Sequence, residues 1–306
     1  MISSAMKHCT LCPRQCGADR NTGHGFCGEG RTVRIARAAL HHWEEPCISG
    51  TRGSGTVFFS GCVLRCVFCQ NHEISHEGKG YAVTENELAE CFLRLKAQGA
   101  HNINLVNPTH FVPQIMAAIG LCGDIGIPFV YNSGGYEKPE TLEMLRGRVS
   151  IFLPDLKYYS SELSKKYSSA ADYYERTMAA IGKMYDIAGK PVFGEDGIMR
   201  SGVIVRHLIL PNSRHDSIAL IEKLRERFAP DEIMVSLMCQ YTPVYRAHEF
   251  KELSRRLSGF EYKTVAEALE KAGFEGFMQE RGSASEDFIP EFYDKPRPDN
   301  YINPRK

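Results

Sequence analysis

The sequence of 306 residues lacks any long hydrophobic run. No apolar stretch approaches the roughly 20 residues that a membrane-spanning helix needs. The first eight residues, MISSAMKH, also lack the apolar centre of a secretory signal peptide. We therefore predict a cytoplasmic protein with no membrane partner.

The sequence also lacks net charge, because 37 Lys and Arg residues balance 37 Asp and Glu residues. A strongly basic protein would attract nucleic acid or anionic lipid over a distance. Balanced charge gives no such attraction, so the composition indicates no nucleic-acid partner and leaves open only a local basic patch.

Cysteine, in contrast, is abundant, with 11 residues. Four of them fall between Cys9 and Cys27, and three between Cys62 and Cys69. The chain is too long for a disulfide-knit miniature domain, and it shows no export signal. Metal binding or catalysis is therefore the expected role of these two groups.

Composition and periodicity divide the chain into four parts. Residues 1–30 form a Cys-rich segment, 31–55 a connector, 56–282 a large α/β domain, and 283–306 a tail with several prolines and aromatic residues. The tail is expected to pack as an extended arm, with disorder as the alternative.

Within residues 56–282, short apolar segments rich in β-forming residues alternate with helical patterns. Strands are predicted at 56–60, 102–106, 128–132, 149–153, 202–210 and 232–238, and helices at 84–96, 111–120, 139–146, 160–187 and 215–228. Thr84 and Glu87 predict a capping box for the first of these helices. Two more helices (247–257 and 264–272) and a strand near 277–279 follow.

Strands joined by helical crossovers form a parallel sheet with helices outside. A complete eight-fold barrel takes about 250 residues, which is more than these six alternations span. We therefore predict an α/β fold, a partial (β/α)6 TIM-like barrel with a small N-terminal Cys-rich metal-binding segment.

Three cysteines with the spacing C-x3-C-x2-C, Cys62, Cys66 and Cys69, follow the first predicted strand. Active sites of such barrels lie at this end of the strands. A closed [4Fe–4S] site needs four thiolates, so three leave one iron open for a cofactor or substrate. A zinc site that takes its fourth ligand from a distant residue, such as His72 or Cys47, stays open as the alternative.

With Phe68 before the third cysteine, this motif resembles the signature of the radical S-adenosylmethionine (SAM) superfamily, and the resemblance covers residues 55–280. It implies that Cys62, Cys66 and Cys69 are the catalytic ligands of a [4Fe–4S] cluster and that Phe68 lies against the adenine of SAM. A reduced cluster would cleave SAM to a 5′-deoxyadenosyl radical that abstracts hydrogen from a substrate. A reductant such as flavodoxin or ferredoxin is implied as a partner.

The strand-end segments resemble those of the pyruvate formate-lyase activating branch of this superfamily. By that resemblance, Asp155 and Lys157 after strand four, and Asn132 and Ser133 after strand three, contribute to the SAM site. For Asp155 and Lys157 a solvated ion pair is the alternative. The same ring of strand ends contains Arg206 in strand five and Gln240 after strand six.

The turn after strand two departs from the superfamily, which usually has a Gly-Gly-Glu-type turn there to hold the amino group of SAM. Here Asn107 and Thr109 supply hydrogen-bonding groups without a carboxylate. The resemblance favours activation of a glycyl radical enzyme. A radical SAM enzyme for a small molecule or peptide, and a non-catalytic iron–sulfur or zinc electron-transfer protein, are the alternatives.

The N-terminal cysteines, Cys9, Cys12, Cys16 and Cys27, have the spacing C-x2-C-x3-C-x10-C. Four thiolates can close a zinc site or bind a complete iron–sulfur cluster. We predict a second metal site here, either zinc or iron–sulfur. Because such a site is closed, it would serve structure or electron relay rather than SAM chemistry.

Overall fold

A computed structural model describes residues 2–279 and Phe292. The predicted tail, 283–306, lies outside the described residues except for Phe292, whose ring packs edge-on against Phe58 with centroids 5.5 Å apart.

A ten-stranded sheet organises the described part of the chain. Its order is β10-β9-β8-β6-β5-β4-β2-β1-β3, with β7 paired to β8. The strands are β1 Val33–His41, β2 Ser54–Phe59, β3 Tyr81–Val83, β4 Ile103–Val106, β5 Phe129–Ser133, β6 Ile151–Pro154, β7 Val192–Phe193, β8 Met199–Leu208, β9 Met234–Met238 and β10 Gly276–Met278.

The predicted partial barrel is confirmed. From β2 through β4, β5, β6, β8 and β9 to β10, neighbouring strands are parallel. The sheet stays open, because its path ends at β10 on one side and at β3 on the other. Each of the six predicted strand segments contains or overlaps one of these strands, and the short strand near 277–279 is β10.

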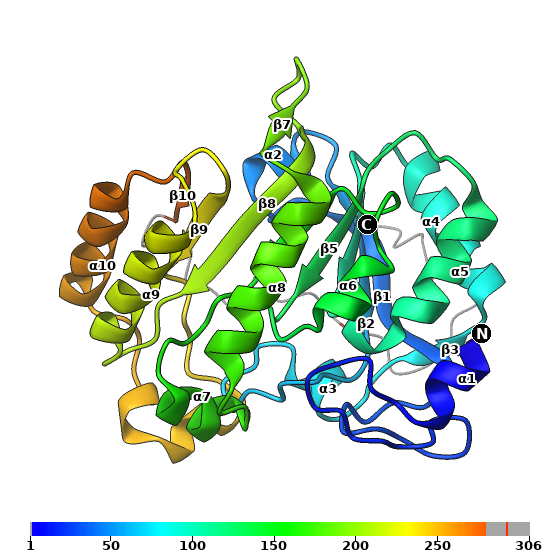
Figure 1. Ribbon diagram of the computed structural model, residues 1–306, viewed down its shortest axis with the longest axis horizontal. Coiled ribbons are helices and arrows are strands. Elements are labelled where there is room, and N and C mark those ends of the chain that lie inside the picture. Colours follow the sequence, from blue (N-terminus) through cyan, green and yellow to red (C-terminus); the bar gives the residue numbers. More distant parts are fainter. Residues whose placement is uncertain (1, 280–291, 293–306) are drawn as a thin grey trace.

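The longer helices pack on the outside of the curved sheet (Figure 1). The helices are α1 Ile2–Lys7, α2 Pro46–Ser49, α3 His72–Ser75, α4 Glu85–Ala97, α5 Val112–Cys122, α6 Pro139–Glu143, α7 Ser161–Ser168, α8 Tyr173–Ala188, α9 Arg214–Arg227 and α10 Gly259–Ala272, with 3-10 turns at Thr109–Phe111, Tyr245–Glu249 and Lys251–Leu253. The predicted capping box of α4 is confirmed. The Thr84 hydroxyl accepts from the Glu87 amide at 3.2 Å, and the Glu87 carboxylate accepts from the Thr84 amide at 2.7 Å.

Two predictions are wrong. The segment 31–55 is not a plain connector, because it contains β1. This strand pairs antiparallel with both β2 and β3. Its buried positions are largely alanines, which give a weak β signal. The helix predicted at 247–257 is instead a pair of 3-10 turns, separated by Phe250 in an extended conformation. The Phe250 ring packs edge-on against Tyr167, so a tertiary contact outweighs the local helical pattern.

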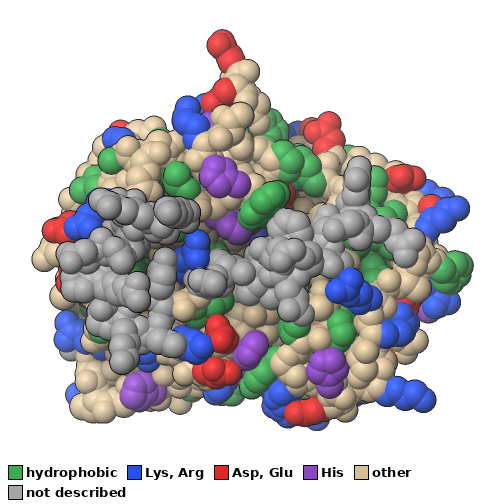
Figure 2. All heavy atoms as spheres, turned by 180° about the vertical axis from the view of Figure 1, so that it is seen from behind, with side chains coloured by type: hydrophobic (Ala, Val, Ile, Leu, Met, Phe, Trp, Pro, Cys, Tyr) green, Lys and Arg blue, Asp and Glu red, His purple; other side chains and the backbone are tan. Residues whose placement is uncertain are grey.

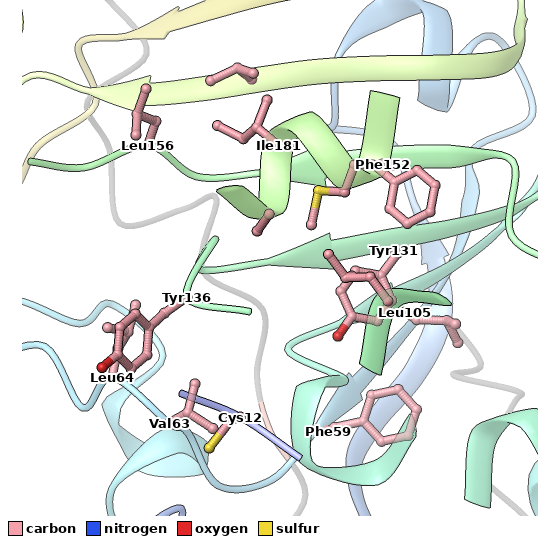
Figure 3. Packing of buried hydrophobic residues seen from close by; sticks show 14 of the residues in the cluster. Cys12, Phe59, Val63, Leu64, Leu105, Tyr131, Tyr136, Phe152, Leu156 and Ile181 are labelled. Atoms are coloured by element: carbon pink, nitrogen blue, oxygen red, sulfur yellow. The ribbon is translucent and has the colours of Figure 1, made fainter. Parts of the chain in front are cut away.

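The main core lies between the sheet and its helices. Leu105, Tyr131 and Phe152 come from three neighbouring strands and share one hydrophobic cluster with Ile181 of α8 (Figure 3). All four side chains are fully buried, so this cluster holds the parallel strands against α8.

The surface carries interspersed charges. On the face seen in Figure 2, both acidic and basic side chains are scattered over the part that grey atoms do not cover. Among the helices of the described residues, none combines the length and the apolar character needed to cross a membrane.

Candidate active site

A cavity of about 720 Å³ opens where the parallel strands end. Its volume falls within the roughly 300–1,000 Å³ that is typical of small-molecule sites. The structure brings all the site residues predicted at the three-cysteine loop and the strand ends to this cavity except Thr109: Cys62, Cys66, Phe68, Cys69, Asn107, Asn132, Ser133, Asp155, Lys157, Arg206 and Gln240.

The loop with the three cysteines begins directly after β2. Gly61 turns the chain with φ +79°, and a Cβ at this position would meet the Cys27 carbonyl oxygen at 2.7 Å. Glycine is therefore required for the N-terminal segment to approach so closely. The loop that follows lines the cavity, where Cys66 is buried and Cys69 is partly buried.

Each of the three sulfurs accepts a hydrogen bond. The Sγ of Cys62 accepts from the Leu64 amide at 3.3 Å, that of Cys66 from the Ser168 hydroxyl at 2.9 Å, and that of Cys69 from the Ser75 hydroxyl at 3.3 Å. Hydrogen bonds to sulfur tune the reduction potential of iron–sulfur clusters. The loop thus supplies three sulfurs that are already held by neighbouring groups.

Burial governs the acidity of two of the thiols, those of Cys66 and Cys69. It raises the pKa of Cys66 to about 11 and that of Cys69 to about 12, although Lys157 partly offsets the effect at Cys66. A buried thiolate is costly unless a positive partner stabilises it. The two thiols therefore need a cationic group, such as a metal centre, in order to ionise at neutral pH.

A buried network of charges also lines the cavity. Lys157 Nζ lies 2.6 Å from Asp155, and Arg206 contacts Asp155 at 3.2 Å and Glu44 at 3.1 Å. The side chains of Asp155 and Lys157 are only 16% and 15% exposed, so the alternative of a solvated ion pair is wrong. Burial acts to raise the pKa of Asp155, but the Lys157 and Arg206 charges outweigh it and hold this pKa below its usual value.

Two acidic residues of the cavity, Glu44 and Glu45, were not predicted from the sequence. Both follow β1 in the segment that was predicted as a connector. Glu44 accepts from the side-chain amides of Asn104 at 3.0 Å and Asn132 at 3.3 Å, and burial raises its pKa despite the Arg206 charge. The sequence signal that could have indicated these residues is the Glu-Glu pair itself, which lies between an apolar segment and Pro46.

The remaining predicted residues differ in their positions. Asn107 adopts a left-handed conformation with φ +59° and donates its side-chain amide to the Gly61 carbonyl. Phe68 packs edge-on against Tyr241, with centroids 6.0 Å apart. Thr109 points away from the cavity, because its hydroxyl donates to the buried Glu137 carboxylate at 2.6 Å.

Similarity to known proteins identifies the family. The chain is 30% identical over 283 residues to the uncharacterised protein MJ0674 of Methanocaldococcus jannaschii, a match that covers 89% of this chain and 76% of that protein. Residues 56–199 match the model of the radical SAM superfamily. The chain belongs to the radical SAM superfamily.

Two solved structures are similar at low identity. Methylornithine synthase (PylB) is 16% identical, with a TM-score of 0.48 over 79% of this chain and 74% of that one. A domain of the pyruvate-formate lyase-activating enzyme from Bacteroides vulgatus is 11% identical, with a TM-score of 0.36 over 64% of this chain and 91% of that one.

Membership implies a radical SAM enzyme that uses a [4Fe–4S] cluster, SAM and a reductant such as flavodoxin or ferredoxin. In the described part of the chain, no three His, Cys, Asp or Glu side chains are arranged to hold a metal ion. The donor set nevertheless fits the cluster. Cys62, Cys66 and Cys69 line the cavity, no other cysteine lines it among the described residues, and each of their sulfurs has a hydrogen-bond donor.

Proposed function

We propose that this radical SAM enzyme binds its [4Fe–4S] cluster through Cys62, Cys66 and Cys69 and binds SAM in the adjoining cavity. The observation that carries the proposal is that these three cysteines and the polar ring of strand ends line one cavity. When bound, the reduced cluster and SAM supply a 5′-deoxyadenosyl radical that abstracts a hydrogen atom from the substrate.

The cavity wall offers complementary groups for SAM, which has a carboxylate, an ammonium group and a ribose diol. Lys157 and Arg206 are the cations that can attract the carboxylate, while Asp155, Glu44 and Glu45 are acceptors for the ammonium group and the hydroxyls. Asn132, Ser133, Asn107 and Gln240 add neutral donors and acceptors, and Phe68 offers an aromatic surface beside the cysteine loop: they are assigned to SAM binding. Such fixed dipoles and charges orient a cofactor and exclude water.

The proposed substrate is a glycyl radical enzyme, from whose glycine the enzyme would abstract hydrogen. Support comes from the resemblance of the strand-end segments at Asn132–Ser133 and Asp155–Lys157 to the pyruvate formate-lyase activating branch. A small molecule or a peptide is the second candidate.

The chemistry can be tested by anaerobic reconstitution with iron and sulfide, followed by addition of dithionite and SAM. We expect 5′-deoxyadenosine from the wild type and none from Cys66→Ala. Cys122→Ala is the matched control, because Cys122 lies at the end of α5 and does not line the cavity. Absence of 5′-deoxyadenosine from fully loaded wild type, or full activity of Cys66→Ala, would overturn the proposal.

The substrate can be tested separately with deuterated glycine incorporated into a candidate glycyl radical enzyme, such as one encoded beside the gene. We expect deuterium in the 5′-deoxyadenosine and a glycyl radical in the electron paramagnetic resonance spectrum. Formation of 5′-deoxyadenosine without either signal, but with turnover of a small molecule or peptide, would favour the second candidate.

A further inference from the structure

The N-terminal coil between α1 and β1 is compact without regular structure. From His8 to Thr32 it forms no helix or strand, although all of its residues are described. Cys9 and Leu11 of this coil form a small separate apolar cluster with Met6 and Ile2 of α1, while Cys12 and Cys27 belong to the main core. Coils of this length are uncommon in compact domains, and segments with so small a core usually depend on a disulfide or a metal.

The four cysteines all belong to this coil, although the described side chains are not yet arranged around one metal position. Two sulfurs, those of Cys27 and Cys16, lie 3.4 and 3.5 Å from the position that a Cβ would take at Gly25. The third cysteine, Cys12, lies in the electrostatic field of Cys27 and Cys9. Backbone hydrogen bonds fold the coil around them, including one from the Gly17 amide to the Cys9 carbonyl at 3.0 Å.

A buried arginine supports the presence of negative charge at this place. Arg20 is 1% exposed and donates to the main-chain carbonyls of Glu29 at 3.0 Å, Gly30 at 2.6 Å and His110 at 2.6 Å. Its Nη1 also lies 3.7 Å from the Sγ of Cys9. Buried cations need a compensating charge, and Glu29, itself 1% exposed, supplies only part of it because burial raises its pKa to about 7 against the Arg34 and Arg20 charges. Four thiolates around zinc or a [4Fe–4S] core carry a net negative charge, whereas four neutral thiols do not.

The coil also contacts the loop that bears Cys62, Cys66 and Cys69. The Cys62 amide donates to the Cys27 carbonyl at 3.1 Å. The Arg14 guanidinium donates to the carbonyls of Val63 at 2.8 Å and Ser168 at 2.9 Å, and the Ser168 hydroxyl in turn donates to the Sγ of Cys66.

Side-chain packing also joins the coil to the loop of Cys62, Cys66 and Cys69. Figure 3 draws Cys12 beside Val63, and both belong to the main hydrophobic core. In Figure 1, β5 and β8 run toward the side of the molecule where the blue N-terminal coil and α3 lie. The coil therefore lies at the strand ends that bear the site.

From this geometry we infer that Cys9, Cys12, Cys16 and Cys27 bind a tetrathiolate metal centre, and that this centre anchors the loop of Cys62, Cys66 and Cys69. The centre is a single zinc ion or a [4Fe–4S] cluster, which share the same four-thiolate donor set. Its position, joined to the loop by the Cys27 carbonyl and by Arg14, makes it a structural support of the catalytic site rather than a second SAM site.

Metal content tests the first half of the inference. In the full chain with Cys62, Cys66 and Cys69 replaced by Ala, purified anaerobically, we expect either about one zinc or about four irons with sulfide per chain. Further replacement Cys12→Ser or Cys27→Ser should abolish this metal, whereas Cys122→Ser should leave it unchanged. A metal-free parent, or a Cys27→Ser variant with full metal content, would overturn the inference. Because the parent cannot cleave SAM through the proposed cluster, this result does not depend on the proposed function.

Hydrogen exchange tests the anchoring. The metal of the same parent chain is released by a mercurial reagent, or by a chelator with ferricyanide if it is an iron–sulfur cluster. We expect exchange to accelerate about ten-fold or more in peptides covering residues 60–69, because local opening then needs less free energy. Peptides covering β5 and β6 should not change, which controls for unfolding of the whole domain. Complete metal release with unchanged exchange at residues 60–69 would refute the anchoring role.

Discussion

Replacing Arg206 by Met tests the buried charge network of the cavity directly. The Arg206 side chain is 14% exposed, and its guanidinium contacts Glu44 at 3.1 Å, Asp155 at 3.2 Å and the side-chain oxygen of Asn132. Methionine has a similar length and no charge. The variant therefore leaves Asp155 with Lys157 alone and leaves Glu44 without its cation, while the apolar volume changes little.

The expected loss is large. Removing one partner of a buried ion pair costs about 3–5 kcal/mol of unfolding free energy, because the other charge stays buried and uncompensated. Arg200→Met on the same strand is the matched control. Arg200 pairs with Asp196, both side chains are 44% exposed, and such a pair contributes less than about 1 kcal/mol.

The loss should also depend on pH. Burial already raises the pKa of Glu44 against the Arg206 charge. Without Arg206 the folded-state pKa of Glu44 should rise further, and that of Asp155 should rise from its present lowered value. A carboxyl group with a folded pKa above its unfolded value destabilises the fold as pH rises through that range. The deficit of Arg206→Met is therefore expected to be greatest near pH 8 and to shrink as the pH falls to 5.

Urea unfolding followed by circular dichroism at pH 8 and pH 5 measures both effects. The variants are compared at equal metal content, so that only the charge network differs. A loss for Arg206→Met that equals that of Arg200→Met, or that does not change with pH, would refute the reasoning.

Three further perturbations follow from the structure. Burial raises the pKa of Glu137 to about 7. Wild type should therefore lose about 3 kcal/mol of stability as pH rises from 4.5 to 7, and Glu137→Gln should flatten that slope in urea unfolding. An unchanged slope would contradict this prediction. Gly135→Ala should reduce stability and SAM affinity more than Gly123→Ala does. Both glycines have positive φ, but only at Gly135 would a Cβ overlap the Asp155 carbonyl. Equal losses for the two variants would contradict this prediction. Thr84→Ala should cost about 1 kcal/mol through loss of the α4 cap, whereas Thr84→Ser should retain most of it.

The parallel sheet could be predicted because its strands are buried on both faces. Such strands appear as short continuous apolar segments, as Ile151–Pro154 does, and helical periodicity separates them. Strand β1 lacks this signal, since alanines fill several of its buried positions. Its place in the sheet depends on pairing with β2 and β3, which no local pattern of residues 33–41 contains.

Some residues of the candidate site could likewise be predicted from the sequence, and others could not. Residues at strand ends, such as Asp155 and Arg206, could be predicted, because the carboxyl ends of parallel strands meet at one edge. The position of Thr109 could not be predicted, because it depends on the distant carboxylate of Glu137. The place of Glu44 in the cavity could not be predicted either. This residue follows β1, which does not belong to the strand–helix repeat.

These corrections bear on the turn at which this chain departs from its superfamily. The Asn107 side-chain amide donates to the Gly61 carbonyl, and the Thr109 hydroxyl donates to the Glu137 carboxylate. Neither is therefore as free to receive an ammonium group as the sequence suggested. The carboxylates that do line the cavity are Glu44, Glu45 and Asp155, and two of these come from the segment between β1 and β2. Acidic groups are thus retained in the cavity but supplied by another part of the chain, so substitutions in residues 42–46 should alter SAM or substrate binding more than substitutions of Thr109.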